Sequence, residues 1–290
     1  MEGEKKTKGI RTVKNENTAK FLSGFAAIVG RPNVGKSTLM NAMVGEKVAI
    51  VSNRPQTTRN RIMGVATDKG WQIVFLDTPG LHKPRTRLGE YMVKSVQDAM
   101  DGIDVLLVLV DANEIGPQDR AIVEEMSARK VKKILVLNKT DIVEEARLMA
   151  AIQSFAEAGY DAIVPISART GKGMDELKKL IVSYLPEGPK YFPDDMITDQ
   201  PERQICAEII REKALNNLRD EIPHGVGVAI NKMQQTEDGT WDIDATILVE
   251  KASHKPIVLG KQGAKIKSIG VHARESIEKL MDEHVFLTLW

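Results

Sequence analysis

The chain has 290 residues, of which 42% are hydrophobic and 28% are charged, and its formal net charge is +1. This length allows two domains with separate cores. The near-neutral charge excludes a global attraction to nucleic acid, so any nucleic-acid site must come from a local cluster of basic residues. The single cysteine, Cys206, excludes an internal disulfide. We expect a cytoplasmic protein, because the sequence has neither a membrane-spanning apolar run nor a signal-peptide apolar region.

The first 185 residues predict an α/β domain behind a short polar extension. Residues 1–22 are expected to be flexible, with a basic arm that touches RNA as the alternative. Residues 23–185 alternate apolar strands with amphipathic helices, which predicts a mostly parallel sheet with helices on both faces. The strands are expected at 24–29, 62–67, 73–77, 105–111, 134–138 and 162–166, and the helices at 36–44, 88–100, 117–128, 144–158 and 174–184. A tight turn between the second and third strands predicts one antiparallel edge strand.

A glycine-rich loop connects the first predicted strand to the first predicted helix. It reads G-x-x-x-x-G-K-S, and its strand–loop–helix context favours a phosphate-binding loop over an ordinary turn. Lys36 would reach the β- and γ-phosphates of a nucleotide, and the Ser37 hydroxyl would ligate Mg²⁺. The GTP-binding residues predicted here are Gly30, Arg31, Pro32, Asn33, Val34, Gly35, Lys36, Ser37 and Thr38.

Two polar segments should respond to the γ-phosphate. A D-x-x-G element ends the third predicted strand, where Asp77 can hold Mg²⁺ through water and the Gly80 N–H can contact the γ-phosphate. The loop at 53–59 should offer Thr58 to Mg²⁺, with Thr57 or an ordinary solvated loop as the alternatives. The nucleotide contacts predicted from the D-x-x-G element are Asp77, Thr78, Pro79 and Gly80.

An N-K-x-D element predicts that the base is guanine. The Asp141 carboxylate can accept hydrogen bonds from N1–H and the exocyclic amine of guanine, whereas adenine offers neither donor there. Lys139 can pack over the base plane, and Asn138 can tie this loop to the phosphate loop. A backbone N–H after the next strand can address guanine O6, and this segment comprises Ser167, Ala168 and Arg169.

Other interpretations of the first domain remain open. One is an RNA-binding chaperone with a degenerate nucleotide site, which the intact Lys36, Ser37 and Asp141 argue against. Another is a P-loop ATPase or kinase. Asp111 and Asp119 are interpreted as strand-end and helix-start residues, not as catalytic acids.

The remaining residues predict a linker and an RNA-binding domain. Residues 186–201 contain four prolines and mark a semi-stiff linker, and residues 202–290 form the second domain. Its expected elements are a helix at 202–221, strands at 226–233 and 241–249, a short segment to 259, a G-x-x-G loop at 260–263, a helix to 281 and a strand at 285–290. A G-x-x-G loop between helices clamps single-stranded nucleic acid in KH domains. Residues 251–274 carry six basic and no acidic side chains. The predicted RNA-binding residues are Gly260, Lys261, Gln262, Gly263, Lys251, Lys255, Lys265, Lys267 and Arg274.

Together these motifs resemble the bacterial Era GTPases over residues 25–290. The resemblance implies a P-loop GTPase domain followed by a prokaryotic-type (type II) KH domain, with GTP and GDP, Mg²⁺, the 3′ end of 16S ribosomal RNA and the 30S subunit as partners. It implies a role in 30S assembly, a monomer, and peripheral association with the inner membrane face, to which no residue pattern points. The family often has a third glycine at the position of Gln262.

The resemblance also carries expectations about hydrolysis. Leu81 stands where Ras-like enzymes place a water-orienting glutamine, so intrinsic hydrolysis should be slow. In related GTPases with this substitution, an asparagine at the position of Asn33 helps to bind K⁺, and we expect K⁺ to accelerate the reaction. A side chain that only stabilises the loop is the alternative. The expected catalytic residues are Lys36, Thr58, Gly80 and, as the K⁺ ligand, Asn33.

Overall fold

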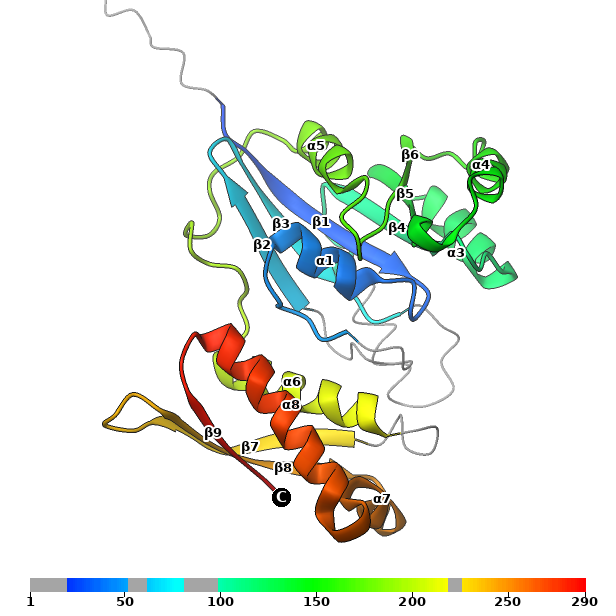
Figure 1. Ribbon diagram of the computed structural model, residues 1–290. Coiled ribbons are helices and arrows are strands. Elements are labelled where there is room, and N and C mark those ends of the chain that lie inside the picture. Colours follow the sequence, from blue (N-terminus) through cyan, green and yellow to red (C-terminus); the bar gives the residue numbers. More distant parts are fainter. Residues whose placement is uncertain (1–19, 52–61, 81–98, 219–225) are drawn as a thin grey trace, which may run out of the picture.

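The computed structural model describes residues 20–51, 62–80, 99–218 and 226–290. Several predicted features lie outside these ranges: most of the N-terminal extension, the loop with Thr57 and Thr58, Leu81, and nearly all of the predicted helix 88–100. The described residues form an α/β domain and a smaller α+β domain (Figure 1).

The first domain contains a six-stranded sheet in the order β2-β3-β1-β4-β5-β6. The strands are β1 (Leu22–Gly30), β2 (Ile62–Asp68), β3 (Trp71–Asp77), β4 (Val105–Asp111), β5 (Lys132–Asn138) and β6 (Ala162–Pro165). β2 runs antiparallel to β3, and all other neighbours are parallel, which confirms the predicted sheet with one antiparallel edge strand. The described helices are α1 (Lys36–Val44), η1 (Thr140–Ile142), α3 (Pro117–Ser127), α4 (Glu145–Ser154) and α5 (Met174–Tyr184).

Both faces of this sheet are buried because successive side chains of a strand point to opposite sides. On β1, Ala26 and Ile28 belong to the core beneath α1 and α5, while Ala27 and Val29 belong to the core beneath α3 and α4. Figure 1 shows these helix pairs on opposite sides of the sheet. The near-continuous apolar strands follow from this double burial.

Helix α4 ends four residues before the predicted position. Phe155 has φ −112° and ψ 2°, so the helix stops there, and residues 156 and 158 make short-range turn hydrogen bonds. Gly159 follows with φ 78°. Phe155 itself is 4% exposed and belongs to the core beneath α3 and α4, and helical periodicity alone does not reveal that the helix ends there.

The linker packs along the first domain instead of crossing freely to the second. The buried Gln72 side chain of β3 accepts hydrogen bonds from the backbone N–H groups of Tyr191 and Phe192, at 2.8 and 3.0 Å. Its amide nitrogen donates to the Phe192 carbonyl at 2.9 Å. Further along, the Val65 N–H of β2 donates to the Ile197 carbonyl at 2.8 Å. Hydrogen bonds at both positions explain why this proline-containing segment is ordered.

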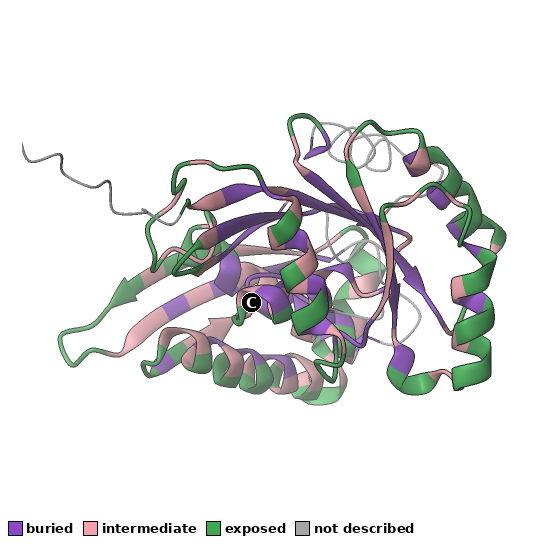
Figure 2. Cartoon of the chain, turned by 90° about the horizontal axis from the view of Figure 1, so that it is seen from above, coloured by how far each residue is buried: buried purple, intermediate pink, exposed green. Residues whose placement is uncertain are grey.

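The second domain is a three-stranded sheet with helices on one face. Its elements are α6 (Glu202–Asn217), β7 (Val226–Gln235), β8 (Trp241–Val249), η2 (Ala252–His254), α7 (Lys255–Leu259), η3 (Lys261–Gly263), α8 (Ala264–Met281) and β9 (Val285–Leu289). β7 is antiparallel to β8, and β8 is parallel to β9. The core lies between this sheet and helices α6 and α8, and Figure 2 shows in purple the buried residues along the chain. In the part of the chain that the structure describes, no helix has the length and apolar character needed to cross a membrane.

One buried carboxylate connects the two domains. Glu212 of α6 lies 2.8 Å from the Lys47 ammonium, just after α1, and accepts a 3.4 Å hydrogen bond from the Val51 N–H. The Glu212 side chain is only 7% exposed, whereas that of Lys47 is 35% exposed. Val51 lies two residues before the segment predicted to respond to the γ-phosphate, so this contact joins the second domain to the predicted nucleotide side of the first.

Candidate nucleotide site and nucleic-acid interface

The phosphate-loop lysine is buried and held by backbone carbonyls. The Lys36 ammonium donates to the carbonyls of Arg31 and Gly30, at 2.8 and 3.2 Å, and the residue is 6% exposed. Burial lowers the pKa of Lys36 to about 8, while the nearby Asp77 carboxylate acts in the opposite direction. A bound phosphate would add negative charge beside this buried ammonium.

The predicted Mg²⁺ ligands at the start of α1 and the end of β3 lie together. The Ser37 hydroxyl donates to the Asp77 carboxylate at 2.7 Å, and Asp77 is fully buried. The next residue, Thr78, donates its hydroxyl to the Ile28 carbonyl at 2.7 Å, which holds the end of β3 against β1. A hydroxyl and a carboxylate are oxygen donors of the kind that Mg²⁺ prefers, so the side chains present fit this ion.

Gly80 lies against the phosphate loop with no room for a side chain. A Cβ atom at Gly80 would be 2.7 Å from both the nitrogen and Cγ of Pro32. This close approach brings the D-x-x-G element to the predicted phosphate loop. The contact of the Gly80 N–H with the γ-phosphate stays a prediction, and the predicted ligand Thr58 lies outside the described residues.

The carboxylate that is predicted to read guanine, Asp141, is oriented by two donors. Asp141 accepts a 2.7 Å hydrogen bond from the Ser167 hydroxyl through Oδ1, and its Oδ2 lies 2.6 Å from Nη2 of Arg169. The hydrogen bond from Ser167 is the main cause that lowers the pKa of Asp141 below its usual value, and the positive charge of Arg169 lowers it further. Each carboxylate oxygen can accept a second hydrogen bond, so guanine N1–H and its amine can be bound in the same orientation.

Asn138 connects the predicted guanine-reading loop to the predicted phosphate loop. Its amide nitrogen donates to the Val34 carbonyl at 2.8 Å, and its amide oxygen accepts a 3.0 Å hydrogen bond from the Ala168 N–H. Gly35 has φ 99°, and a Cβ atom there would be 2.3 Å from this amide nitrogen. Glycine is therefore required at Gly35 both by the backbone conformation and by the position of Asn138.

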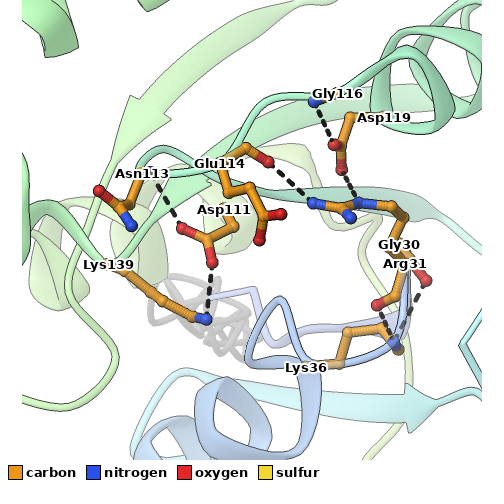
Figure 3. Close-up of polar contacts among 9 residues, drawn as sticks. All are labelled: Gly30, Arg31, Lys36, Asp111, Asn113, Glu114, Gly116, Asp119 and Lys139. Atoms are coloured by element: carbon orange, nitrogen blue, oxygen red, sulfur yellow. Dashed lines mark hydrogen bonds and ion pairs between the residues drawn. The ribbon is translucent and has the colours of Figure 1, made fainter. Parts of the chain in front are cut away.

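Two ion pairs around this site are absent from the sequence-based interpretation (Figure 3). Lys139 lies 2.7 Å from the Asp111 carboxylate, and Arg31 lies 2.7 Å from the Asp119 carboxylate. The Arg31 side chain therefore points to the start of α3, although the loop that carries it is the predicted phosphate site. Sequence spacing gives no signal for either pair, because the partners come from separate β–α connections.

A groove in the second domain brings together some of the predicted RNA-binding residues. It has a volume of about 310 Å³ and lies between α8 and β9. Its lining combines basic and apolar residues: Ile266, Lys267, Gly270, Val271, Arg274, Leu287 and Leu289. Lys267 and Arg274 were predicted, whereas the predicted Lys251, Lys255, Lys261 and Lys265 do not line this groove.

The G-x-x-G loop leads directly into α8. Gly260 has φ 73°, and a Cβ atom there would be 2.8 Å from the Lys265 side chain. Gln262 has φ 50°, which is the left-handed region that glycine adopts without strain. The loop thus places the amino end of α8 beside the groove.

Comparisons with known proteins agree with this geometry. Residues 25–139 match a family model described as 50S ribosome-binding GTPase, and residues 221–290 match one described as KH domain. The chain is 50% identical to GTPase Era of Ruminiclostridium cellulolyticum over 93% of this chain and 91% of the relative. It is 54% identical to GTPase Era of Clostridioides difficile over 93% of this chain and 92% of the relative.

Two solved structures resemble the whole described fold. A variant of Aquifex aeolicus Era bound to GDP·AlF₄⁻ is 40% identical, with a TM-score of 0.89 and 93% of each chain covered. A second structure, of Era in complex with MgGDPNP and nucleotides 1506–1542 of 16S ribosomal RNA, is 40% identical, with a TM-score of 0.87 and 93% of each chain covered.

Proposed function

The chain belongs to the Era family of GTPases, and from this premise we propose that it is a GTP-hydrolysing switch that binds the 3′ end of 16S ribosomal RNA and assists 30S maturation. The observation that carries the proposal is the combination of an oriented guanine-reading site and a basic groove in one chain. The guanine-reading site selects a nucleotide whose γ-phosphate is lost on hydrolysis, which gives the protein two states, and the groove offers a site whose RNA binding those states can control.

The nucleotide part of the proposal assigns separate tasks to the described side chains. Lys36 neutralises charge on the β- and γ-phosphates, and Asp141 reads guanine while Ser167 and Arg169 hold it in place. Ser37 and Asp77 would hold Mg²⁺, which neutralises phosphate charge when bound. Magnesium is a component of the related complex with GDPNP and RNA.

The RNA part rests on the groove beside the G-x-x-G loop. Lys267 and Arg274 extend from α8 into the lining, where they can pair with phosphates, while Leu287 and Leu289 of β9 offer apolar contact to bases. The related structure contains a fragment of 16S ribosomal RNA, which supports the same class of ligand for this groove.

Crosslinking of bound RNA in cells, followed by sequencing, tests the ligand. We expect reads concentrated at the 3′ end of small-subunit ribosomal RNA and lost with a Lys267→Glu, Arg274→Glu double variant. Lys279→Glu is a matched control, because Lys279 is an exposed residue of the same helix and does not line the groove. Recovery of scattered messenger RNAs would overturn the ribosomal assignment.

We extend the proposal to stimulation of hydrolysis by K⁺ through Asn33. Asn33 lies at an exposed turn of the phosphate loop with φ 65°, a conformation that asparagine tolerates. The alternative is that Asn33 only shapes this turn. Asn33→Gly separates the two roles, because glycine keeps the backbone conformation and removes the amide. We expect faster turnover in KCl than in NaCl for the wild type and no difference for Asn33→Gly; equal wild-type rates would contradict the K⁺ role.

We also propose a monomer that acts in the cytoplasm and associates peripherally with the inner membrane face. Light scattering of the purified chain tests whether it is a monomer, and a mass of two or more chains would refute this. Flotation with anionic lipid vesicles tests the membrane association, which a chain remaining in the lower fraction would refute.

A further inference from the structure

Two buried carboxylates lie at the ends of the segment that connects β4 to α3. Asp111 is the last residue of β4, and Asp119 is in the first turn of α3. They are 7% and 1% exposed, respectively. Burial of an ionised carboxylate is unfavourable unless charged and hydrogen-bonding partners compensate for it. The partners of these two acids are therefore informative.

Asp119 fixes the side chain of a phosphate-loop residue. Its Oδ1 accepts a 2.7 Å hydrogen bond from Nε of Arg31, and its Oδ2 accepts one of 2.8 Å from the Gly116 N–H. Nη2 of Arg31 also donates to the Glu114 carbonyl at 2.8 Å. The Arg31 backbone carbonyl, in turn, accepts the Lys36 ammonium at 2.8 Å. One residue thus joins the start of α3 to the lysine that faces the phosphates (Figure 3).

Asp111 makes the corresponding contact with the guanine-reading loop. Its Oδ2 lies 2.7 Å from the Lys139 ammonium, and its Oδ1 accepts a 2.9 Å hydrogen bond from the Asn113 N–H. The neighbouring Ala112 N–H donates to the Asn138 carbonyl at 2.9 Å. Each acid therefore uses one oxygen to shape its own segment and the other to hold a cation of a nucleotide loop.

We propose that residues 111–119 brace the two nucleotide loops, with Asp119 and Asp111 as positioning residues that act through Arg31 and Lys139. The inference rests on the proposed function, because it assumes that these loops bind GTP and GDP. Both acids act on loop geometry before the nucleotide arrives, so the binding groups need little rearrangement. Loss of either acid should loosen one loop and speed nucleotide release.

The experiment measures release of a fluorescent GDP analogue from the full chain by stopped-flow chase. Asp119→Asn and Asp111→Asn should each increase the release rate about tenfold, the loss typical of a charge-assisted hydrogen bond. Asp161→Asn is the control. Asp161 has the same pattern of contacts, with Lys132 and the Lys133 N–H at 2.8 Å each, but lies at the opposite end of β5.

Double variants distinguish positioning from a general effect on folding. If Asp119 acts through Arg31, Asp119→Asn should not change release further in an Arg31→Ala chain. The same holds for Asp111→Asn in a Lys139→Ala chain. Additive effects in both backgrounds, or single variants that release GDP at the rate of Asp161→Asn, would overturn the brace. A wild-type chain that does not bind GDP would overturn the proposed function, and the brace with it.

Discussion

Removal of Lys47 should destabilise the chain more than neutralisation of its partner, Glu212. The two side chains meet at 2.8 Å between the domains, but Glu212 is 7% exposed and Lys47 is 35% exposed. Water can therefore replace the partner of the lysine but not that of the glutamate. The order of the two losses follows from this difference in burial.

The magnitudes follow from what each variant leaves behind. In Glu212→Gln the Lys47 ammonium returns to solvent and the amide oxygen can still accept the Val51 N–H, so the loss should be about 1 kcal/mol, as for a partly exposed pair. In Lys47→Met the carboxylate stays buried. An uncompensated buried charge costs roughly 3–5 kcal/mol, and Lys213, at 3.3 Å, should reduce this to about 2–3 kcal/mol.

Urea unfolding and calorimetry of the full-length variants measure this difference. Lys232→Met is a suitable control, because Lys232 is 46% exposed and its partner Asp242 is 28% exposed, so its loss should be small. Equal losses for Lys47→Met and Glu212→Gln, or a larger loss for Glu212→Gln, would refute the argument from burial.

Three further predictions concern the two binding sites. Asp141→Asn should lower GTP affinity at least about a hundredfold and favour xanthosine triphosphate, measured by competition titration, because the amide donates where the carboxylate accepts; retained GTP preference would contradict the assigned base contact. Gly80→Ala should weaken GTP binding, because its methyl group would lie 2.7 Å from Pro32. Calorimetric titration measures the affinity, and an unchanged value would contradict this steric argument. Gln262→Gly should raise stability by up to about 1–2 kcal/mol, because Gln262 has φ 50° and already bears the cost of the left-handed region, whereas Gln262→Val should lower stability because valine is branched at Cβ; equal melting temperatures would contradict strain at this position.

The sequence was sufficient for the sheet and for most of the described helices, because these depend on local apolar patterns. Apolar periodicity predicted α1 and α5 with their observed bounds. Asn138 was expected to tie the N-K-x-D loop to the phosphate loop, and it donates a hydrogen bond to the Val34 carbonyl of that loop. The end of α4 at the buried Phe155 was not predictable from periodicity.

Side-chain partners across separate connections were also beyond the sequence. Asp119 was interpreted only as a helix-start residue, which is correct for its hydrogen bond to the Gly116 N–H. Its second partner, Arg31, is 88 residues away, and the pairing arises only after β1 and β4 align in the sheet. Charge pairs of this kind require the register of the fold before they can be assigned.

The packed linker has a consequence for association between molecules. β2 is an edge strand, and an exposed edge offers unpaired N–H and C=O groups to strands of other chains. The linker satisfies two of these groups, because the Val65 N–H donates to the Ile197 carbonyl and the Met63 carbonyl accepts the Thr198 hydroxyl at 2.7 Å. At the other edge, β6 has only four residues and ends at Pro165, which has no N–H to offer. The segment that joins the domains therefore also protects the first of them against edge-to-edge aggregation.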